Sequence, residues 1–192
     1  MYINPNNKIH DPNNTNTDLI EVLHKLGKPR IIKKGETILS EGDNVDFVFI
    51  VEKGCFRTYR WIEEEEVTIG FSFEGDIDTC PYAFINKTKS SDTIETLVDS
   101  KVIKIHLHQI ELLKKENSQM NEFIQALLSQ YIEILINRNI DLRTKNADIL
   151  YSDLLKRQPQ EVAKIPLMYI ASYLGISKER LSRIRKKLNH LT

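Results

Sequence analysis

The spacing of hydrophobic residues changes along this chain, and the change divides it into regions. Between residues 30 and 105, short apolar runs alternate with turn signals such as Lys53-Gly54 and Gly75-Asp76. The apolar runs are 47–51, 55–62, 67–73, 93–98 and 102–105. Short strands at such regular intervals are typical of an antiparallel sandwich or barrel. We therefore expect a small antiparallel β-barrel or jelly roll in the first half of the chain.

From about residue 107 to residue 142 the apolar residues follow a helical spacing instead. Leucine, methionine or isoleucine recurs every seventh residue along one stripe, which is the repeat of a coiled coil. No second long helix is available to cover this stripe, so we expect a parallel homodimer. The alternative is that both sides of the helix pack within one chain. The expected dimer residues are Leu113, Asn117, Met120, Ile124, Leu127, Tyr131, Ile134 and Arg138.

Residues 166–188 predict two short helices joined by a tight turn. Pro166 suits the first position of a helix, and the apolar residues of 167–174 repeat at helical spacing. Gly175 suits the left-handed conformation in which many helices end, and Ser177 is a natural N-cap for the next helix. This is the layout of a helix-turn-helix that binds DNA. The alternative is a plain helical hairpin with a solvated basic face.

The second of these helices would enter the major groove of DNA with its polar face. An arginine there can bond guanine in bidentate fashion, and a glutamate can accept a hydrogen bond from cytosine. Lysines and arginines further along can bind phosphates. The expected DNA-contacting residues are Ser177, Lys178, Glu179, Ser182, Arg183 and Lys186.

The distribution of charge supports this assignment. The chain carries 27 basic and 27 acidic residues, so its net charge is zero. From Lys164 onward, however, seven lysines and arginines stand against one glutamate, a net charge of +6. Residues 1–163 therefore carry −6. A neutral protein with one basic segment is expected to meet a polyanion through that segment only.

Several other classes of protein are not expected. The polar start lacks the apolar core of a signal peptide, and no apolar run approaches the length of a membrane span, so we expect a cytoplasmic protein. Cys55 and Cys80 are too few for a disulfide framework or a four-cysteine metal cluster. His106 and His108 could share a metal on a strand, but they stand where strand changes to helix. We therefore expect no metal, no cofactor and no enzymatic activity.

The order of barrel, long helix and helix-turn-helix resembles the Crp/Fnr superfamily of bacterial transcription regulators. The most specific piece is 169–188, YIASYLGISKERLSRIRKKL, in which ERLSR at 179–183 is similar to the E-x-x-S-R pattern of the Fnr-like branch. Stretches 33–43 and 48–59 look like that family's barrel strands. The resemblance implies an α+β fold with a cyclic-nucleotide-binding-like barrel, a long dimerisation helix and a winged-helix-like helix-turn-helix. It also implies that Glu179 and Arg183 contact bases.

The chain departs from this family at the effector site. Members that bind cyclic nucleotides carry a G-E pair and an R-S pair that hold ribose and phosphate. Counted from Gly75-Asp76, these pairs fall on Thr79-Cys80 and Ser90-Ser91, so the phosphate-binding arginine is missing. We therefore expect binding of neither cyclic AMP nor cyclic GMP, and residues 79–84 suit a hydrophobic ligand or none. The effector-pocket candidates are Thr79, Cys80, Tyr82, Ser90 and Ser91.

These inferences combine into one hypothesis about organisation and function. We expect a flexible arm at 1–16, a sensor barrel at 17–106 that begins with a short helix at 19–26, a dimerisation helix at 107–142 and a DNA-binding domain at 143–192. The chain would regulate transcription as a homodimer on a near-palindromic operator in double-stranded DNA, would contact RNA polymerase if it is an activator, and would not bind membranes. The alternative is a non-DNA signalling module that binds a small ligand and docks a protein partner through its terminal helices.

Overall fold

A β-barrel, a long helix and a group of short helices follow one another in the computed structural model, which describes residues 15–157 and 159–189. The barrel strands are β1 (Lys28–Ile32), β2 (Thr37–Leu39), β3 (Phe47–Lys53), β4 (Cys55–Ile62), β5 (Glu65–Phe73), β6 (Ile77–Asp78), β7 (Thr93–Thr96) and β8 (Ser100–His106). In the described residues they form two antiparallel sheets, ordered β1-β8-β3-β6 and β2-β7-β4-β5. The expected α+β fold with an antiparallel barrel is confirmed.

The inside of the barrel is filled by alternate side chains of facing strands, as the pleat of a strand requires. Phe49, Phe56, Ile94 and Val102 are completely buried there. The sequence analysis found the long strands, and the resemblance over 33–43 included β2, but β1 and β6, which are largely exposed or short, were not found. It also did not find helix α2 (Pro81–Asn86), which lies between β6 and β7.

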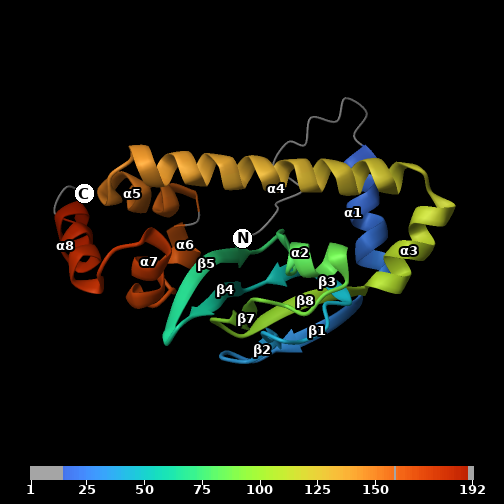
Figure 1. The fold of residues 1–192 in the computed structure, drawn as a ribbon, viewed down its shortest axis with the longest axis horizontal. Helices are drawn as coiled ribbons and strands as arrows, with labels where there is room; N and C mark the ends of the chain where they lie inside the picture. Colours follow the sequence, from blue (N-terminus) through green and yellow to red (C-terminus); the bar gives the residue numbers. More distant parts are fainter. Residues whose placement is uncertain (1–14, 158, 190–192) are drawn as a thin grey trace.

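The outer face of the sheet that contains β3 and β8 is covered by helices. They are α1 (Thr15–Leu26), α3 (Leu107–Glu116) and the first half of α4 (Gln119–Thr144). Leu23, Ile50, Ile103 and Phe123 pack together in this second core. In Figure 1, α4 extends over the barrel from α3 at one end to the C-terminal helices at the other.

The expectation of a single helix over 107–142 is wrong, because the helix is interrupted at residues 117–118, between α3 and α4. Asn117 has an extended backbone (φ −132°, ψ 109°), and its Oδ1 accepts a hydrogen bond from the backbone N–H of Gln119 at 2.9 Å. An asparagine side chain competes in this way with the hydrogen bonds of a continuous helix. The N-terminal helix is also longer than the expected 19–26, since α1 begins at Thr15.

The C-terminal helices are α5 (Ala147–Arg157), α6 (Pro159–Val162), α7 (Leu167–Leu174) and α8 (Lys178–Asn189). Their core includes side chains of the barrel, because Ile170 and Ala171 of α7 share one buried cluster with Phe71 and Phe73 of β5. Residues 143–157 and 159–189 contain no strand, so the wing of a winged helix is not seen in this part of the chain.

Candidate DNA-binding site and effector region

Helices α7 and α8 form the helix-turn-helix that the sequence predicted. Gly175 ends α7 in the left-handed conformation (φ 66°) and donates its N–H to the carbonyls of Ala171 and Ser172. Leu181 and Ile184 of α8 are buried against α7 and α5. The buried side of α8 is thus fixed, and its opposite side faces solvent.

The residues expected to contact DNA lie on that exposed side. Ser177 Oγ accepts a hydrogen bond from the backbone N–H of Arg180 at 3.2 Å and so caps α8. Lys178, Glu179, Arg183 and Lys186 are exposed, and Ser182 is half-buried. Neighbouring members of this set are separated by one, three or four positions along the helix, so their side chains lie on one face of α8.

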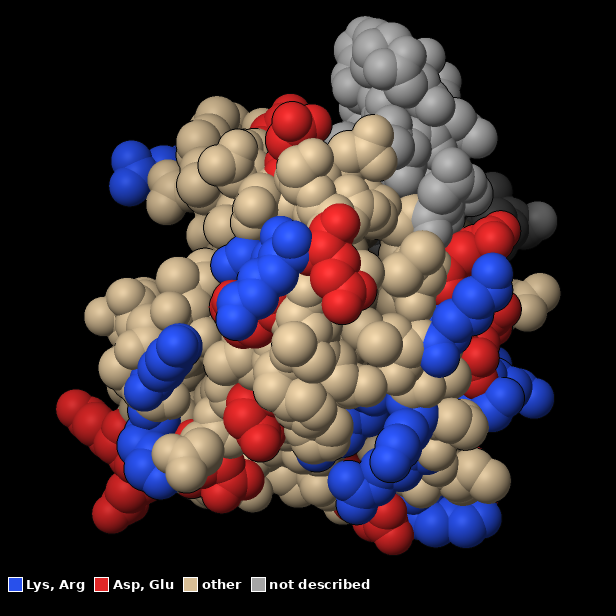
Figure 2. All heavy atoms as spheres, turned by 90° about the vertical axis from the view of Figure 1, so that its right-hand side faces the viewer, with Lys and Arg blue, Asp and Glu red and all other residues tan. Residues whose placement is uncertain are grey.

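Three further basic residues of α8, which are Arg180, Arg185 and Lys187, were not among the expected contacts. Arg180 is exposed in the first turn, beside Glu179. Lys187 instead pairs with Asp148 of α5, its Nζ lying 3.2 Å from Oδ2. The opposite end of the molecule, formed by α1 and α3, differs in charge. Figure 2 shows lysines and arginines interspersed there with acidic residues, so no single sign of charge dominates that face.

Helix α7 is held against β4 and β5 by polar and aromatic contacts, which we call the α7 contact. Ser172 Oγ accepts a hydrogen bond from the N–H of Thr68 at 2.9 Å and donates to the carbonyl of Glu66 at 3.3 Å. The rings of Phe71 and Tyr173 pack edge to face with centroids 5.3 Å apart. The orientation of the helix-turn-helix on the barrel is therefore specified by directional contacts as well as by apolar packing.

Arg57 of β4 is the centre of this contact, and the sequence analysis missed it. Its side chain is 2% exposed. Nη1 lies 2.7 Å from Glu66 Oε2 and 3.1 Å from Glu95 Oε1. The guanidinium lies between the rings of Tyr59, 4.3 Å from its centroid, and Tyr169, at 3.7 Å. A buried charge is tolerated only when it is paired in this way. An arginine in an otherwise uncharged stretch, CFRTY, was the available signal.

The structure corrects the first part of the expected dimer stripe. Met120 is 1% exposed and packs in the core between barrel and helices, and Leu113, Ile124 and Leu127 pack against the same core. Asn117 is the C-cap of α3. These side chains do not form an exposed seam, because the sheet of β3 and β8 lies beneath the first half of α4.

The second half of α4 differs from the first. Arg138, expected in the seam, instead donates from Nη2 to the carbonyl of Tyr173 and lies over its ring, 3.6 Å from the centroid. Tyr131 and Ile134 are half-buried. The exposed apolar residues of this half are Ile132, Leu135, Ile136, Ile140 and Leu142.

Most of the effector-pocket candidates gather around Asp92. The thiol of Cys80 donates to Asp92 Oδ2 at 3.4 Å, and Ser90 Oγ donates to the Asp92 carbonyl at 2.7 Å. Thr79 Oγ1 instead donates to the carbonyl of Phe47 at 2.9 Å. Tyr82 does not join the group, because its side chain is 72% exposed on α2.

Arg60 of β4 completes this cluster and was also missed. Its Nε donates to Asp92 Oδ1 at 2.8 Å and its Nη2 to Ser91 Oγ at 2.7 Å. The bond to Asp92 raises the pKa of Arg60. Tyr131 of α4 lies near the cluster. Burial is the main cause that raises the pKa of its hydroxyl, and the charge of Asp92 adds to the effect.

Comparisons with known proteins agree with this architecture. Residues 29–117 match the family model of the cyclic nucleotide-binding domain. The chain is 25% identical to the transcriptional activator FnrA of Stutzerimonas stutzeri and 24% identical to the transcriptional activator Anr of Pseudomonas aeruginosa, in each case over 87% of this chain and 72% of the relative. The structure of FixK2 from Bradyrhizobium japonicum superposes with a TM-score of 0.74 at 18% identity, covering 86% of this chain and 85% of that one. The chain is thus similar in sequence to two transcriptional activators and similar in fold to a solved structure described as a transcriptional regulator of the Crp/Fnr family, with a TM-score of 0.69 at 19% identity.

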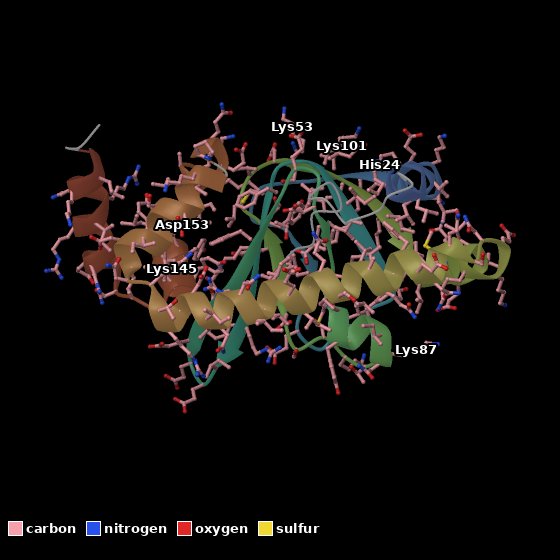
Figure 3. All side chains as sticks on the ribbon, turned by 90° about the horizontal axis from the view of Figure 1, so that it is seen from above. His24, Lys53, Lys87, Lys101, Lys145 and Asp153 are labelled. Atoms are coloured by element: carbon pink, nitrogen blue, oxygen red, sulfur yellow. The ribbon has the colours of Figure 1, made fainter. Side chains whose placement is uncertain are left out.

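Compared with the Crp/Fnr pattern that the sequence resembles, the chain has an unusual set of charges in its effector region. The arginine that the family places beside Ser91 is absent, and Arg60 reaches Ser91 from β4 instead. Arg60 is already bound to a carboxylate, however. Lys87 and Lys89 are exposed, and Figure 3 shows Lys87 at the outer end of α2. No lysine or arginine in the described residues 79–91 is buried.

The described part of the chain contains neither a membrane-spanning helix nor a group of metal-ligating side chains. No helix in 15–157 or 159–189 is both long and apolar enough to cross a bilayer. His106 and His108 stack with ring centroids 5.7 Å apart. Within the same residues, no three histidine, cysteine, aspartate or glutamate side chains gather where they could hold a metal ion.

Proposed function

We propose that this transcription regulator binds DNA sequence-specifically, as a homodimer on a near-palindromic operator. The observation that carries the proposal is the division of α8 into two faces. Leu181 and Ile184 fix one face in the core, while Glu179, Arg183 and Lys186 are exposed on the other. An amphipathic second helix of a helix-turn-helix with such residues matches the chemistry of base and phosphate contact in a major groove.

The second copy would cover the exposed apolar residues of α4. Ile132, Ile136 and Ile140 are each at least 50% exposed and lie four residues apart, so they form one stripe. A contiguous apolar stripe of this kind marks an interaction surface. A two-fold dimer would present two α8 helices to half-sites about one turn of DNA apart.

Selection of bound sequences from random DNA, using the purified full-length protein, tests the proposal. We expect an enriched motif with two-fold symmetry. Affinity for that motif, measured by fluorescence anisotropy, should fall steeply as salt rises, because bound phosphates release their counterions. Absence of an enriched motif, or an affinity that does not change between low and high salt, would overturn it.

A further inference from the structure

An apolar cavity lies outside the barrel interior, where α1, α2 and α4 meet the outer face of β3 and β6. Its volume is 110 Å³. Val48 and Ile77 form its floor from the sheet, and Phe123 and Ile124 close it from α4. It is a different place from the cluster around Asp92, whose carboxylate binds Arg60. Of the effector-pocket candidates, Thr79 lines the cavity, whereas Cys80, Tyr82, Ser90 and Ser91 are not among its described lining residues.

The lining is almost entirely hydrocarbon. Among the described residues that line the cavity, Asp78 and Thr79 alone are polar. Asp78 is buried, and its carboxyl accepts hydrogen bonds from Ser72 Oγ and from the Thr79 N–H. Thr79 Oγ1 donates to the Phe47 carbonyl. The polar groups at the wall already have partners within the protein, so they hold little capacity for a ligand.

An anionic ligand is excluded by the same chemistry. None of the described lining residues is a lysine, an arginine or a histidine. Burial is the main cause that raises the pKa of the Asp78 carboxyl, so the site already disfavours one negative charge. A second anion, such as a phosphate or a carboxylate, would lose its hydration without gaining a cation. A neutral apolar molecule has no such cost.

The size of the cavity limits the ligand further. A cavity of about 150 Å³ with comparable walls stays dry and can bind benzene. The cavity here is somewhat smaller, but Ile85 of α2 is 53% exposed at its rim and Leu128 of α4 is half-buried. These side chains can move outward without disturbing the core. We propose that this cavity binds one small, uncharged, apolar molecule of about the size of a single aromatic ring.

Such a ligand would touch both α2 and α4. Phe84 and Ile85 belong to α2, while Ile124 and Leu128 belong to α4. A bound ring would therefore add contacts between the helix beside the effector region and the helix that carries the exposed apolar stripe. The binding itself is independent of the proposed DNA binding, and it is tested without DNA.

The experiment is a titration of the full-length protein with benzene, followed by thermal unfolding and by methyl NMR. We expect a saturable rise of the melting temperature and shift changes centred on the methyl groups of Ile77, Ile124 and Leu128. Benzoate has nearly the same size but carries a charge, so it should give no saturable response. Equal responses to benzene and benzoate, or no saturable response to benzene, would overturn the proposal.

Two filling variants and one control locate the site. Ile124→Phe places a ring in the cavity and should weaken benzene binding at least tenfold. Ile31→Phe adds the same ring on β1, at a side chain that is 70% exposed, and should leave benzene binding unchanged. If Ile124→Phe does not fold because it overpacks the core, Leu128→Phe at the rim replaces it. Unweakened binding to the folded filling variant would show that benzene binds elsewhere, and the proposal would fail.

Discussion

The guanidinium of Arg57 lies 3.7 Å from the centroid of the Tyr169 ring, and this pair joins a strand of the barrel to the first helix of the helix-turn-helix. The same guanidinium is bound to Glu66 and Glu95 within the barrel. A cation close to an aromatic face is stabilised by the ring. A change in the barrel that moves β4 would therefore act directly on α7.

Replacing Arg57 tests how strongly this pair holds the two parts together. Arg57→Met removes the charge and leaves Glu66 and Glu95 without their cation. Removing one member of a buried pair costs about 3–5 kcal/mol. Here the glutamates are 31% and 18% exposed, so we expect the free energy of unfolding to fall by about 2–3 kcal/mol. Urea unfolding measures the loss.

A matched control lies on the same strand. Arg60→Met removes an equivalent ion pair with Asp92, but the side chain of Arg60 is 43% exposed. Its partner Asp92 is 12% exposed but also accepts a hydrogen bond from the Cys80 thiol, so the loss should be smaller than for Arg57→Met, which leaves two glutamates without their cation. Tyr169→Phe keeps the ring and should be nearly neutral. Equal losses for Arg57→Met and Arg60→Met would contradict the central position of Arg57.

The exposed face of α8 leads to a prediction about base choice. Arg183→Ala should lower affinity for the selected operator by about 1–3 kcal/mol and relax preference at one base pair per half-site. Lys186→Ala should weaken all sequences about equally, because a phosphate contact carries no sequence information. Anisotropy with operator variants separates the two effects.

Arg185 provides the control for this comparison. It is exposed on α8, two residues from Arg183 and therefore on a different side of the helix. Arg185→Ala should leave base preference unchanged. If Arg183→Ala keeps both the affinity and the preference of the natural protein, the proposed position of α8 in the groove is wrong.

The apolar stripe of α4 leads to a prediction about assembly. Ile136 is 55% exposed, so Ile136→Asp should leave the folded monomer intact. In a dimer the carboxylate would be buried without a partner, which is strongly unfavourable. Analytical ultracentrifugation should show a shift from dimer to monomer, together with loss of operator binding. Ile31→Asp on β1 is the control and should remain dimeric. An Ile136→Asp protein that stays dimeric would place the interface elsewhere.

Ligand selectivity can be tested with nucleotides. A cyclic nucleotide in the effector region would bring a phosphate next to Asp92, which already binds Arg60. Isothermal titration of the purified protein with cyclic AMP and cyclic GMP should give no binding in the micromolar range, and neither should change operator affinity. Saturable binding at one site per subunit would contradict this. Loss of that binding in Arg60→Ala would then show that the arginine leaves Asp92 for the nucleotide.

Local signals explain which parts of the structure the sequence could predict. The helix-turn-helix was found because its information lies within about twenty consecutive residues. Gly175 needs a left-handed backbone, Ser177 caps the next helix, and Leu181 and Ile184 follow at helical spacing. The long strands were found for the same reason, since alternation and turn residues act over a few positions.

Contacts between distant residues explain what was missed. The partners of Arg57 are as far away in the sequence as Tyr169, and Arg60 meets Asp92 only after the barrel has closed. The apolar stripe on α4 shows a different limit of what hydrophobic periodicity can predict. Periodicity placed Met120 on an apolar stripe, which we expected to face a second copy, but periodicity cannot say whether the covering surface is another copy or the chain's own barrel. The residues that stay exposed, such as Ile136, depend on where the sheet ends beneath the helix.

The continuous core beneath β5 and α7 also determines how far the protein can adapt along DNA. Because Ile170 of α7 and Leu181 of α8 are buried in one cluster with Phe71 and Phe73 of β5, each recognition helix would be packed through α7 against its barrel. In a dimer, the distance between the two helices is then set by the whole scaffold, with no tether to lengthen. One inserted base pair displaces a half-site by about 3.4 Å along the axis and also turns it. Such a protein would be as selective for the spacing between the two half-sites as for their base sequence.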